Sequence, residues 1–518
     1  MPEHLRALVV ILGLALCTFW MVRPLAPTLG MADQEFVHRR NMWFAITLVA
    51  FLSGSFWIYV AITGILVLAR VKASKPDPNP VALCLFLVLA VPPFSAEIPF
   101  VGGIRYLFTI NHIKLLSLTC LLPALLVLLQ DKATPRFGRI ASDYWVVGFF
   151  LLPSLLQFSA DSFTNTLRGT FDRSIDILLP YFVVSRSIRS EEKLREVLGA
   201  LVTASILLAP VAVFEAIQYW LLYSALPGAL GIFWAMGSYL GRGTADSLRA
   251  VASTGHSIAL GYTLSVGFFA YMALRRQGSG HAMRWLAVLC IFVGGIVMAK
   301  SRGPWVGAGA GLLVYALFGR TPMRDLLRLT GLGLAMGAVL LLTPFGDKVI
   351  DLLPFVGTVD SDNVDYRQRL LTIGWQVVLQ SPFFGAHSYI FGQMLESLRQ
   401  GQGIIDIVNS YLGIALSSGL VGLSLFVGSF ASAIWVAIRN VTQRGNASTT
   451  LEQMTRGLLA ATTCILVTIF TVSSITVIPF IYWCILGLLA GTQQLYPLRT
   501  ARSLAASQST ATPAHRPI

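Results

Sequence analysis

Long apolar runs follow one another along almost the whole chain. They predict about fourteen membrane-spanning helices, at 5–22, 42–69, 81–94, 113–130, 144–159, 175–185, 196–220, 256–274, 284–300, 303–319, 325–343, 409–437, 457–474 and 477–495. A run of about 18–25 apolar residues crosses roughly 30 Å of hydrocarbon, and helices satisfy their own backbone hydrogen bonds in lipid. The runs at 81–94 and 175–185 are short, so we expect half-spans or spans that use neighbouring residues. The pattern predicts an all-α, polytopic membrane helix bundle.

The longest interruption of this pattern is residues 343–411. Asp365 is a good N-cap for a helix that begins near Tyr366, and Pro382 should stop that helix. Three apolar residues share one face of it with Arg367, namely Leu371, Trp375 and Val378. We expect this amphipathic helix to lie on the outer membrane surface, with its arginines at phosphate depth.

The order of runs and loops predicts five parts of the chain. They are N-terminal spans at 1–220, central spans with an outer loop at 221–343, a large extracytoplasmic loop at 344–408, C-terminal spans at 409–495 and a disordered cytoplasmic tail at 496–518. The tail is rich in Ala, Ser, Thr and Pro, which do not bury enough apolar surface to fold.

Composition agrees with a membrane protein. Charged residues make up 12% of 518, about half of what a soluble chain carries, and hydrophobic residues make up 55%. All six cysteines lie inside apolar runs without Cys-x-x-Cys spacing, so we interpret them as buried small apolar residues. This pattern supports neither a disulfide framework nor a metal site.

The net charge of +14 is better explained by membrane orientation than by nucleic-acid binding. With a cytoplasmic N-terminus, the inside loops hold 23 of the 38 Lys and Arg residues, although the outside loops are longer. This bias predicts that residues 221–255, 300–303 and 344–408 face outward.

Several arginines are expected at this outer face, against the charge bias. Arg302 follows one span and opens the next, and Arg249, Arg367 and Arg369 lie in other outer segments. One arginine there could simply anchor on lipid head groups. Several together suggest a site for a diphosphate, because the planar guanidinium binds two phosphate oxygens and stays charged. The expected owner of a diphosphate on that side is a lipid carrier.

Three segments resemble a known family. Lys300-Ser301-Arg302-Gly303-Pro304-Trp305 resembles the Ser-Arg-Gly signature of the O-antigen ligase and Wzy-type polymerase superfamily. Residues 367–385 resemble its Arg…Trp…Pro-x-x-Gly stretch, and 408–423 its His-Asn-x-Tyr-Leu…Gly-Leu-x-Gly-Leu segment. The resemblance spans about 250–430. It implies a bundle of the GT-C type, a bacterial inner-membrane glycosyltransferase whose active site faces the periplasm.

The resemblance also implies a reaction and its partners. A glycan passes from undecaprenyl diphosphate to an acceptor hydroxyl with inversion, without metal or other cofactor, and the lipid-linked donor and acceptor lie in the bilayer. Arg249, Arg302 and Arg367 become the diphosphate-binding set, with Arg369 as a second candidate near Arg367. A flippase and a chain-length regulator are possible partners, and nucleic acid is not expected.

The sequence departs from the ligase pattern at Val408, where the ligases have a histidine proposed to help activate the acceptor. Asp406, His387 and His256 are the candidate catalytic replacements. The missing histidine favours a polymerase of O-antigen or exopolysaccharide repeat units over an O-antigen ligase. A protein O-oligosaccharyltransferase and a non-enzymatic flippase or transporter of lipid-linked glycan remain alternatives.

Two acidic features stay open. Asp360-Ser361-Asp362 has the Asp-x-Asp form of a metal motif, but solvated acids at a helix start explain it better, and we expect no metal site. Glu215 lies within an apolar run, where carboxylates are expensive and often functional. It is expected either to line a glycan cavity or to lie near the outer surface.

Overall fold

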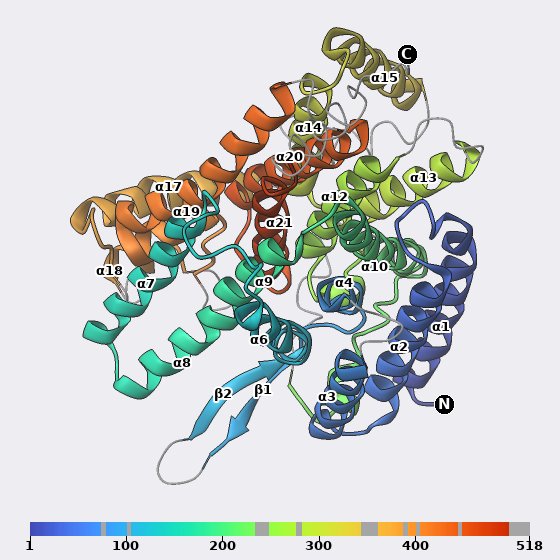
Figure 1. Cartoon of the computed structure of the whole chain (residues 1–518). Coiled ribbons are helices and arrows are strands. Elements are labelled where there is room, and N and C mark those ends of the chain that lie inside the picture. The colour runs from blue at the N-terminus through green and yellow to red at the C-terminus, as the bar shows by residue number, and fades with distance from the viewer. Residues whose placement is uncertain are drawn as a thin grey trace, which may run out of the picture.

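The protein is a bundle of helices from which one β-hairpin projects (Figure 1). The computed structural model describes residues 1–73, 79–100, 105–233, 248–275, 282–342, 361–386, 392–399, 405–443 and 448–496. The predicted tail from 497 onward and residues 343–360 of the predicted loop lie outside the described residues.

The N-terminal half of the chain supplies most of the centre of the bundle. Its elements are α1 (Glu3–Val22), α2 (Asp33–Leu52), α3 (Phe56–Ala73), α4 (Pro80–Leu87), β1 (Ser95–Pro99), β2 (Tyr106–Asn111), α5 (His112–Leu116), α6 (Leu122–Gln130), α7 (Asp143–Ala160), α8 (Phe163–Arg173), α9 (Leu179–Ser187), α10 (Glu191–Gln218) and α11 (Leu226–Ala229). Short π-helical segments join α5 to α6 (Ser117–Leu121) and α8 to α9 (Ser174–Leu178). Helix α10 is buried along most of its length, so it forms the axis of the core.

The C-terminal half packs around α10 and α12. Its elements are α12 (Ser257–Leu274), α13 (Ala282–Met298), α14 (Arg302–Leu317), α15 (Pro322–Leu342), α17 (Ser361–Gln380), α18 (Gln393–Glu396), α19 (Ser410–Thr442), α20 (Thr449–Phe470) and α21 (Ile478–Thr492). Short 3-10 turns lie at Arg23–Leu25 and Ala252–Thr254.

The helical membrane architecture predicted from the apolar runs is confirmed. Within the described residues, seven helices are long and apolar enough to cross a membrane, and two shorter apolar helices, Met283–Met298 and Ile478–Thr492, accompany them. The short run at 81–94 is a half-span, because its helix α4 ends at Leu87 with every residue from Val81 buried. The chain then turns into the hairpin, which the sequence did not predict.

That hairpin is a simple antiparallel pair. Ser95 pairs with Asn111 and Glu97 with Thr109, and the register shifts between Glu97 and Pro99. The guanidinium of Arg168 on α8 braces it, since its Nε donates to the carbonyl oxygen of Leu107 at 3.0 Å.

One predicted span is wrong. The run at 42–69 is not a single helix but the end of α2 and most of α3, which are separated at Ser53–Ser55. Gly54 in this break has a φ of +62°, a left-handed conformation that glycine adopts at no steric cost. The backbone N–H of Phe56 then donates to the carbonyl oxygen of Leu230, at 2.9 Å, which fixes the start of α3.

Because α2 and α3 are two helices and not one span, the N-terminus lies at the other end of the bundle from the predicted one. The indole N–H of Trp220, just after α10, donates to Glu3 at 3.0 Å. At the other end of α10, Arg195 donates to the carbonyl oxygen of Thr28 at 3.1 Å. These ends are far apart, because a helix of 28 residues is about 42 Å long. The N-terminus therefore lies on the side of residues 219–233, not on the side of 186–195 as the sequence predicted.

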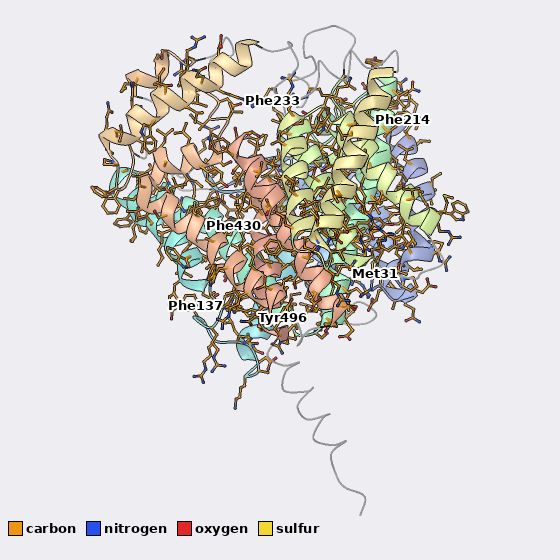
Figure 2. The ribbon with its side chains drawn as sticks, turned by 90° about the horizontal axis from the view of Figure 1, so that it is seen from above. Met31, Phe137, Phe214, Phe233, Phe430 and Tyr496 are labelled. Carbon is orange, nitrogen blue, oxygen red and sulfur yellow. The ribbon has the colours of Figure 1, made fainter. Side chains whose placement is uncertain are left out.

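The bundle thus has two distinct ends. We call the end that holds residues 248–256, 300–303, 405–410 and 471–477 the corner end, and the other, with 131–141 and 186–195, the opposite end. Figure 2 shows Phe214 and Phe233 at one end of the bundle and Phe137 and Tyr496 at the other. Phe430, in the second half of α19, lies between them.

A glycine seam fixes the start of α14 against α20. A Cβ at Gly303 would lie 2.4 Å from Thr471 Oγ1, and one at Gly307 would lie 2.2 Å from Thr468 Oγ1. Gly311 continues the seam one turn later, where a Cβ would lie 2.8 Å from the Ala460 carbonyl oxygen. The absence of side chains every fourth residue lets the two backbones approach closely, as in other membrane helix pairs.

Helix α17 packs on the start of α19 in a small separate core. The predicted end before Pro382 is confirmed, but the helix starts at Ser361, so Asp365 lies inside it and is not its N-cap. The face that packs on the protein shares only Val378 with the predicted apolar face, and the placement of that apolar face on the membrane surface stays a prediction. Leu371 and Trp375 are 43% and 48% exposed, whereas the packed positions are Leu370, Gly374 and Val378.

Candidate functional site

Arg302 lies at a tight bend of the corner end. It is the first residue of α14, and Ser301 before it is buried. Lys300 turns the chain between α13 and α14 with a φ of +45°, a conformation that non-glycine residues adopt only under constraint. The Trp305 indole N–H donates to the Ile296 carbonyl oxygen at 3.0 Å and so ties the two helices together. The bend therefore holds Lys300 and Arg302 together.

Glu215 positions the segment that carries Arg249. One carboxylate oxygen accepts from the backbone N–H groups of Val251 and Ala252, at 2.9 and 2.8 Å, and the other accepts from Leu222 at 3.0 Å. Glu215 is 1% exposed. Of the two roles expected for it, the structure supports the second: the carboxylate lies near the end of α10 and binds backbone.

Arg249 is buried and close to the bend that holds Arg302. The backbone N–H of Ala250 donates to the Met298 carbonyl oxygen at 3.2 Å, which places this segment at the end of α13. Burial lowers the pKa of Lys300, and the positive charge of Arg249 lowers it further. The two predicted arginines, Arg249 and Arg302, thus flank one positively charged corner with Lys300.

A loop between α20 and α21 joins this corner to the start of α19. Gly303 packs against Thr471, as described above, and the next residue, Val472, accepts a hydrogen bond from Ser410 Oγ at 2.8 Å. Ser474 Oγ donates to Ser410 Oγ at 2.8 Å. Asn409 caps α19 by accepting from the Leu412 N–H at 3.1 Å. The Ser-Arg-Gly bend and the Asn-Ser-Tyr segment therefore meet at 471–474.

Asp406 is held at the same place by two different elements. Ser473 Oγ donates to Asp406 Oδ1 at 2.9 Å. From α17, the hydroxyl of Tyr366 donates to the backbone carbonyl oxygen of Asp406 at 2.9 Å. The carboxylate remains exposed, and the residue after Tyr366 is the half-buried Arg367. Three of the predicted segments therefore meet around the loop at 471–474, beside the exposed Asp406.

The other candidate residues lie in different surroundings. Val408 packs with the apolar cluster between α17 and α19, so its position is part of a core. Arg369 is exposed and lines an open depression on α17 with Asp365 and Thr372. His387 and Asp360 lie outside the described residues. Among the described residues, no group of three or more His, Cys, Asp or Glu side chains could hold a metal ion.

His256 has a structural role that competes with base catalysis. Its Nδ1 accepts from the Ile258 N–H at 3.2 Å and so caps α12. Burial lowers the pKa of His256 to about 4, and the charge of Arg249 adds to this effect. With Nδ1 committed to the helix cap, only Nε2 of His256 is left to take a proton from an acceptor hydroxyl, whereas Asp406 is exposed.

Sequence reasoning missed Tyr366, Ser473 and Ser474, which hold the site together. Tyr366 was noted only as a helix start. The serines are the last two residues of the predicted span 457–474, and a polar pair at the end of a span was the one available signal.

Comparison with known families matches one part of the chain. Residues 285–427 match the family model described as O-antigen ligase (Wzy_C). The matched segment includes Arg302, Arg367 and Asp406, while Arg249 and His256 precede it. No curated protein matches the chain. Residues 285–427 of this multi-pass membrane protein are therefore similar to the O-antigen ligase family.

Proposed function

Because the chain carries an O-antigen ligase domain, we propose that it is a glycosyltransferase that polymerises lipid-linked oligosaccharide repeat units. The observation that supports this most is the convergence of the Ser-Arg-Gly bend, α17 and the start of α19 on the loop at 471–474. The corner end then holds donor and acceptor together, and undecaprenyl diphosphate is the carrier of both.

Arg249, Arg302 and Arg367 bind the diphosphate of the donor. When the glycosidic bond breaks, its electron pair stays with the diphosphate, whose negative charge increases. Fixed guanidinium groups stabilise that charge more in the transition state than in the ground state. Lys300 adds positive potential, since it lies within the electrostatic influence of Arg249.

Asp406 activates the acceptor hydroxyl. Its carboxylate is exposed, and the hydrogen bond from Ser473 to Oδ1 fixes its orientation and leaves the other oxygen for the acceptor proton. The hydroxyl oxygen then attacks the anomeric carbon as the diphosphate leaves on the other side, which inverts the configuration. Val408 packs in an apolar cluster, which supports a route that does not use the histidine of the ligases.

The corner end faces the periplasm, with the protein in the inner membrane. Once the N-terminus is moved to the corner end, Arg23, Arg39 and Arg40 join the opposite end and Arg6 leaves it. Counted along the sequence, the loops assigned to the cytoplasmic side then contain 25 of the 38 Lys and Arg residues instead of 23, which strengthens the positive-inside bias.

The proposal is tested with Arg302→Lys and Arg367→Lys in cells that carry the variant as their only copy. Lysine keeps the charge but loses the two-point hydrogen bonding of the guanidinium. We expect the long polymer to disappear while lipid-linked single repeats accumulate on the outer side.

Arg399→Lys is the matched control, because Arg399 is an exposed loop arginine paired with Glu396 at 2.6 Å. It should leave polymer length unchanged. Normal polymer in both site variants would refute the site, and single repeats retained on the cytoplasmic side would show a flippase instead.

A further inference from the structure

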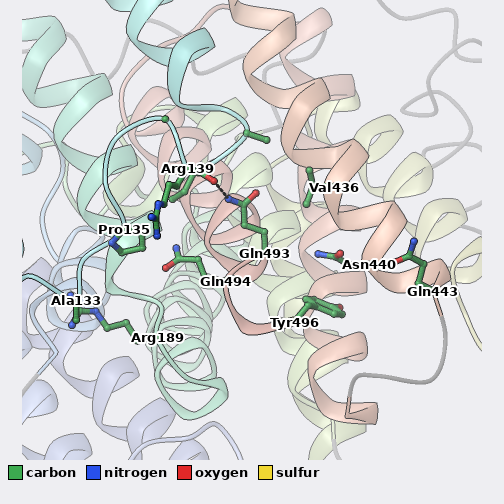
Figure 3. A pocket seen from close by; sticks show the side chains of 13 residues that line it. Ala133, Pro135, Arg139, Arg189, Val436, Asn440, Gln443, Gln493, Gln494 and Tyr496 are labelled. Atoms are coloured by element: carbon green, nitrogen blue, oxygen red, sulfur yellow. Dashed lines mark hydrogen bonds between the residues drawn. The ribbon is translucent and has the colours of Figure 1, made fainter. Parts of the chain in front are cut away.

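A cavity of about 830 Å³ opens at the opposite end of the bundle, far from the proposed active site (Figure 3). It is lined by Ala133, Pro135, Gly138, Arg139, Ile140, Ala141, Arg189, Val436, Asn440, Gln443, Gln493, Gln494 and Tyr496. These residues come from the α6–α7 loop, the segment after α9, the last turns of α19 and the segment after α21. Neither the catalytic proposal nor the sequence motifs use them.

The cavity carries positive charge. Arg139 is exposed at its rim, and among the described residues no carboxylate pairs with its guanidinium. Arg189 pairs with Asp131 and donates to Thr134 Oγ1 at 2.7 Å. Lys132 and Arg136, in the same α6–α7 loop as Arg139, are exposed nearby and add to the potential. The site therefore favours an anion.

The cavity also offers hydrogen-bond acceptors. The amide of Gln493 donates to the Arg139 carbonyl oxygen at 3.1 Å, drawn in Figure 3, and that of Gln494 donates to the Ser185 carbonyl oxygen at 2.8 Å. Because these amide nitrogens bind backbone, the amide oxygens are left to accept hydrogen bonds from a ligand. Asn440 on α19 and Gln443 directly after it lie on the other side of the cavity (Figure 3).

Exposed aromatic side chains mark the depth of this cavity in the membrane. Tyr144 at the start of α7 is 67% exposed and Trp435 on α19 is 71% exposed, and Trp435 precedes the lining residue Val436. Tyrosine and tryptophan concentrate at the level of lipid head groups. The helices α9, α19 and α21 all end here, so the cavity lies at the boundary between lipid and water.

We propose that this cavity binds a phosphate diester with neighbouring hydroxyls, presented as the head group of an anionic glycerophospholipid in the adjacent leaflet. Arg139 takes the phosphate oxygens while Arg189 stays paired with Asp131, and the amide oxygens of Gln493 and Gln494 accept from the head-group hydroxyls. Basic cavities between membrane helices on the cytoplasmic side bind anionic head groups in this way. The inference rests on this cavity and is independent of the proposed catalytic function.

The test uses the purified full chain in a neutral detergent. Binding is measured by the rise in Tm, and by titration of the affinity, on addition of phosphatidylglycerol, phosphatidylcholine or soluble glycerol phosphate. A ligand that binds only the folded state raises its stability. We expect phosphatidylglycerol to raise Tm clearly more than phosphatidylcholine does.

Two variants of neighbouring arginines locate the binding site. Arg139→Gln should weaken phosphatidylglycerol binding about tenfold, since one charge-assisted contact is lost at a partly exposed position. Arg136→Gln removes the same charge three residues away, outside the lining, and should keep the affinity of the unmodified protein. Asn440→Leu should weaken binding without any change of charge.

Three results would overturn the proposal. Equal phosphatidylglycerol affinity in the Arg139→Gln variant and the unmodified protein would exclude this cavity. An equal loss of phosphatidylglycerol affinity in the Arg136→Gln variant would show that the lipid is attracted by the overall positive charge and not bound in this cavity. Stabilisation by glycerol phosphate as strong as that by the lipid would keep the phosphate chemistry but show that the ligand is soluble.

Discussion

Replacing Glu215 should lower activity strongly, although in the proposed site Glu215 does not contact the substrate. Its carboxylate joins the end of α10 to Val251 and Ala252, two and three residues beyond Arg249. Glu215→Ala leaves all three backbone N–H donors, including that of Leu222, without their acceptor in a buried site. The segment that carries Arg249 then loses its attachment to the bundle.

The structure sets the expected size of this effect. An unsatisfied buried donor costs about 1–3 kcal/mol, so Glu215→Ala should cost on the order of 3 kcal/mol or more. Glu215→Gln is milder, because the amide oxygen can still accept from Val251 and Ala252. Its NH₂ group then faces the Leu222 N–H, so one donor is unsatisfied, at a cost of about 1–3 kcal/mol. Both Tm and polymer yield should be highest in the unmodified protein, lower in Glu215→Gln and lowest in Glu215→Ala.

The assay is polymer yield per folded protein in membranes, with Tm measured on the purified variants. A double-mutant cycle with Arg249→Lys separates a positioning role from general damage. If Glu215 acts through Arg249, Glu215→Gln should lower activity much less when Arg249 is already replaced. Full activity in a folded Glu215→Ala variant, or strictly additive losses in the cycle, would refute this reasoning.

Three further predictions concern other parts of the site. Gly307→Ala should lower the free energy of unfolding by about 1–3 kcal/mol, because its Cβ would lie 2.2 Å from Thr468 Oγ1. A Cβ at Gly309 would meet nothing within 4 Å, so Gly309→Ala should leave Tm unchanged or higher. Equal losses of Tm in the two variants would contradict the close packing of α14 on α20. Asp406→Asn should abolish transfer while lipid-linked donor still binds, as measured by donor titration, and a variant with normal turnover would exclude Asp406 as the base. Burial and the charge of Arg249 lower the pKa of His256 to about 4, below its usual 6.5, so the folded protein favours the neutral imidazole. Its contribution is therefore complete above about pH 6.5 and lost as the pH falls toward 4; His256→Asn should flatten the fall in Tm between pH 7 and 5, and an unchanged fall would contradict it.

The helices themselves were predictable from the apolar runs, because a lipid-facing backbone leaves few alternatives to a helix. The division of 42–69 was not predicted, although Ser53-Gly54-Ser55 marks it, because three small residues are also compatible with a continuous membrane helix. That one break moved the N-terminus to the other end of the bundle. The contacts that show it, such as Trp220 with Glu3, join residues far apart in the chain.

The candidate site was predictable only in part. Arg302 and Arg367 could be selected from local motifs, but the link from Asp406 to Ser473 depends on packing across 67 residues. The buried face of α17 was ambiguous, because apolar residues occupy two adjacent rows that start at Leu370 and Leu371. Packing of Gly374 on Leu412 selects the first row, and no local pattern encodes that choice.

The central claim is tested most directly with the purified full chain in a defined bilayer, given labelled lipid-linked repeat units as the only glycan. The account predicts a ladder of lipid-linked oligomers and released undecaprenyl diphosphate, and no ladder with Arg302→Lys. A folded, unmodified chain that yields no ladder, or an Arg302→Lys variant that yields the same ladder, would contradict it.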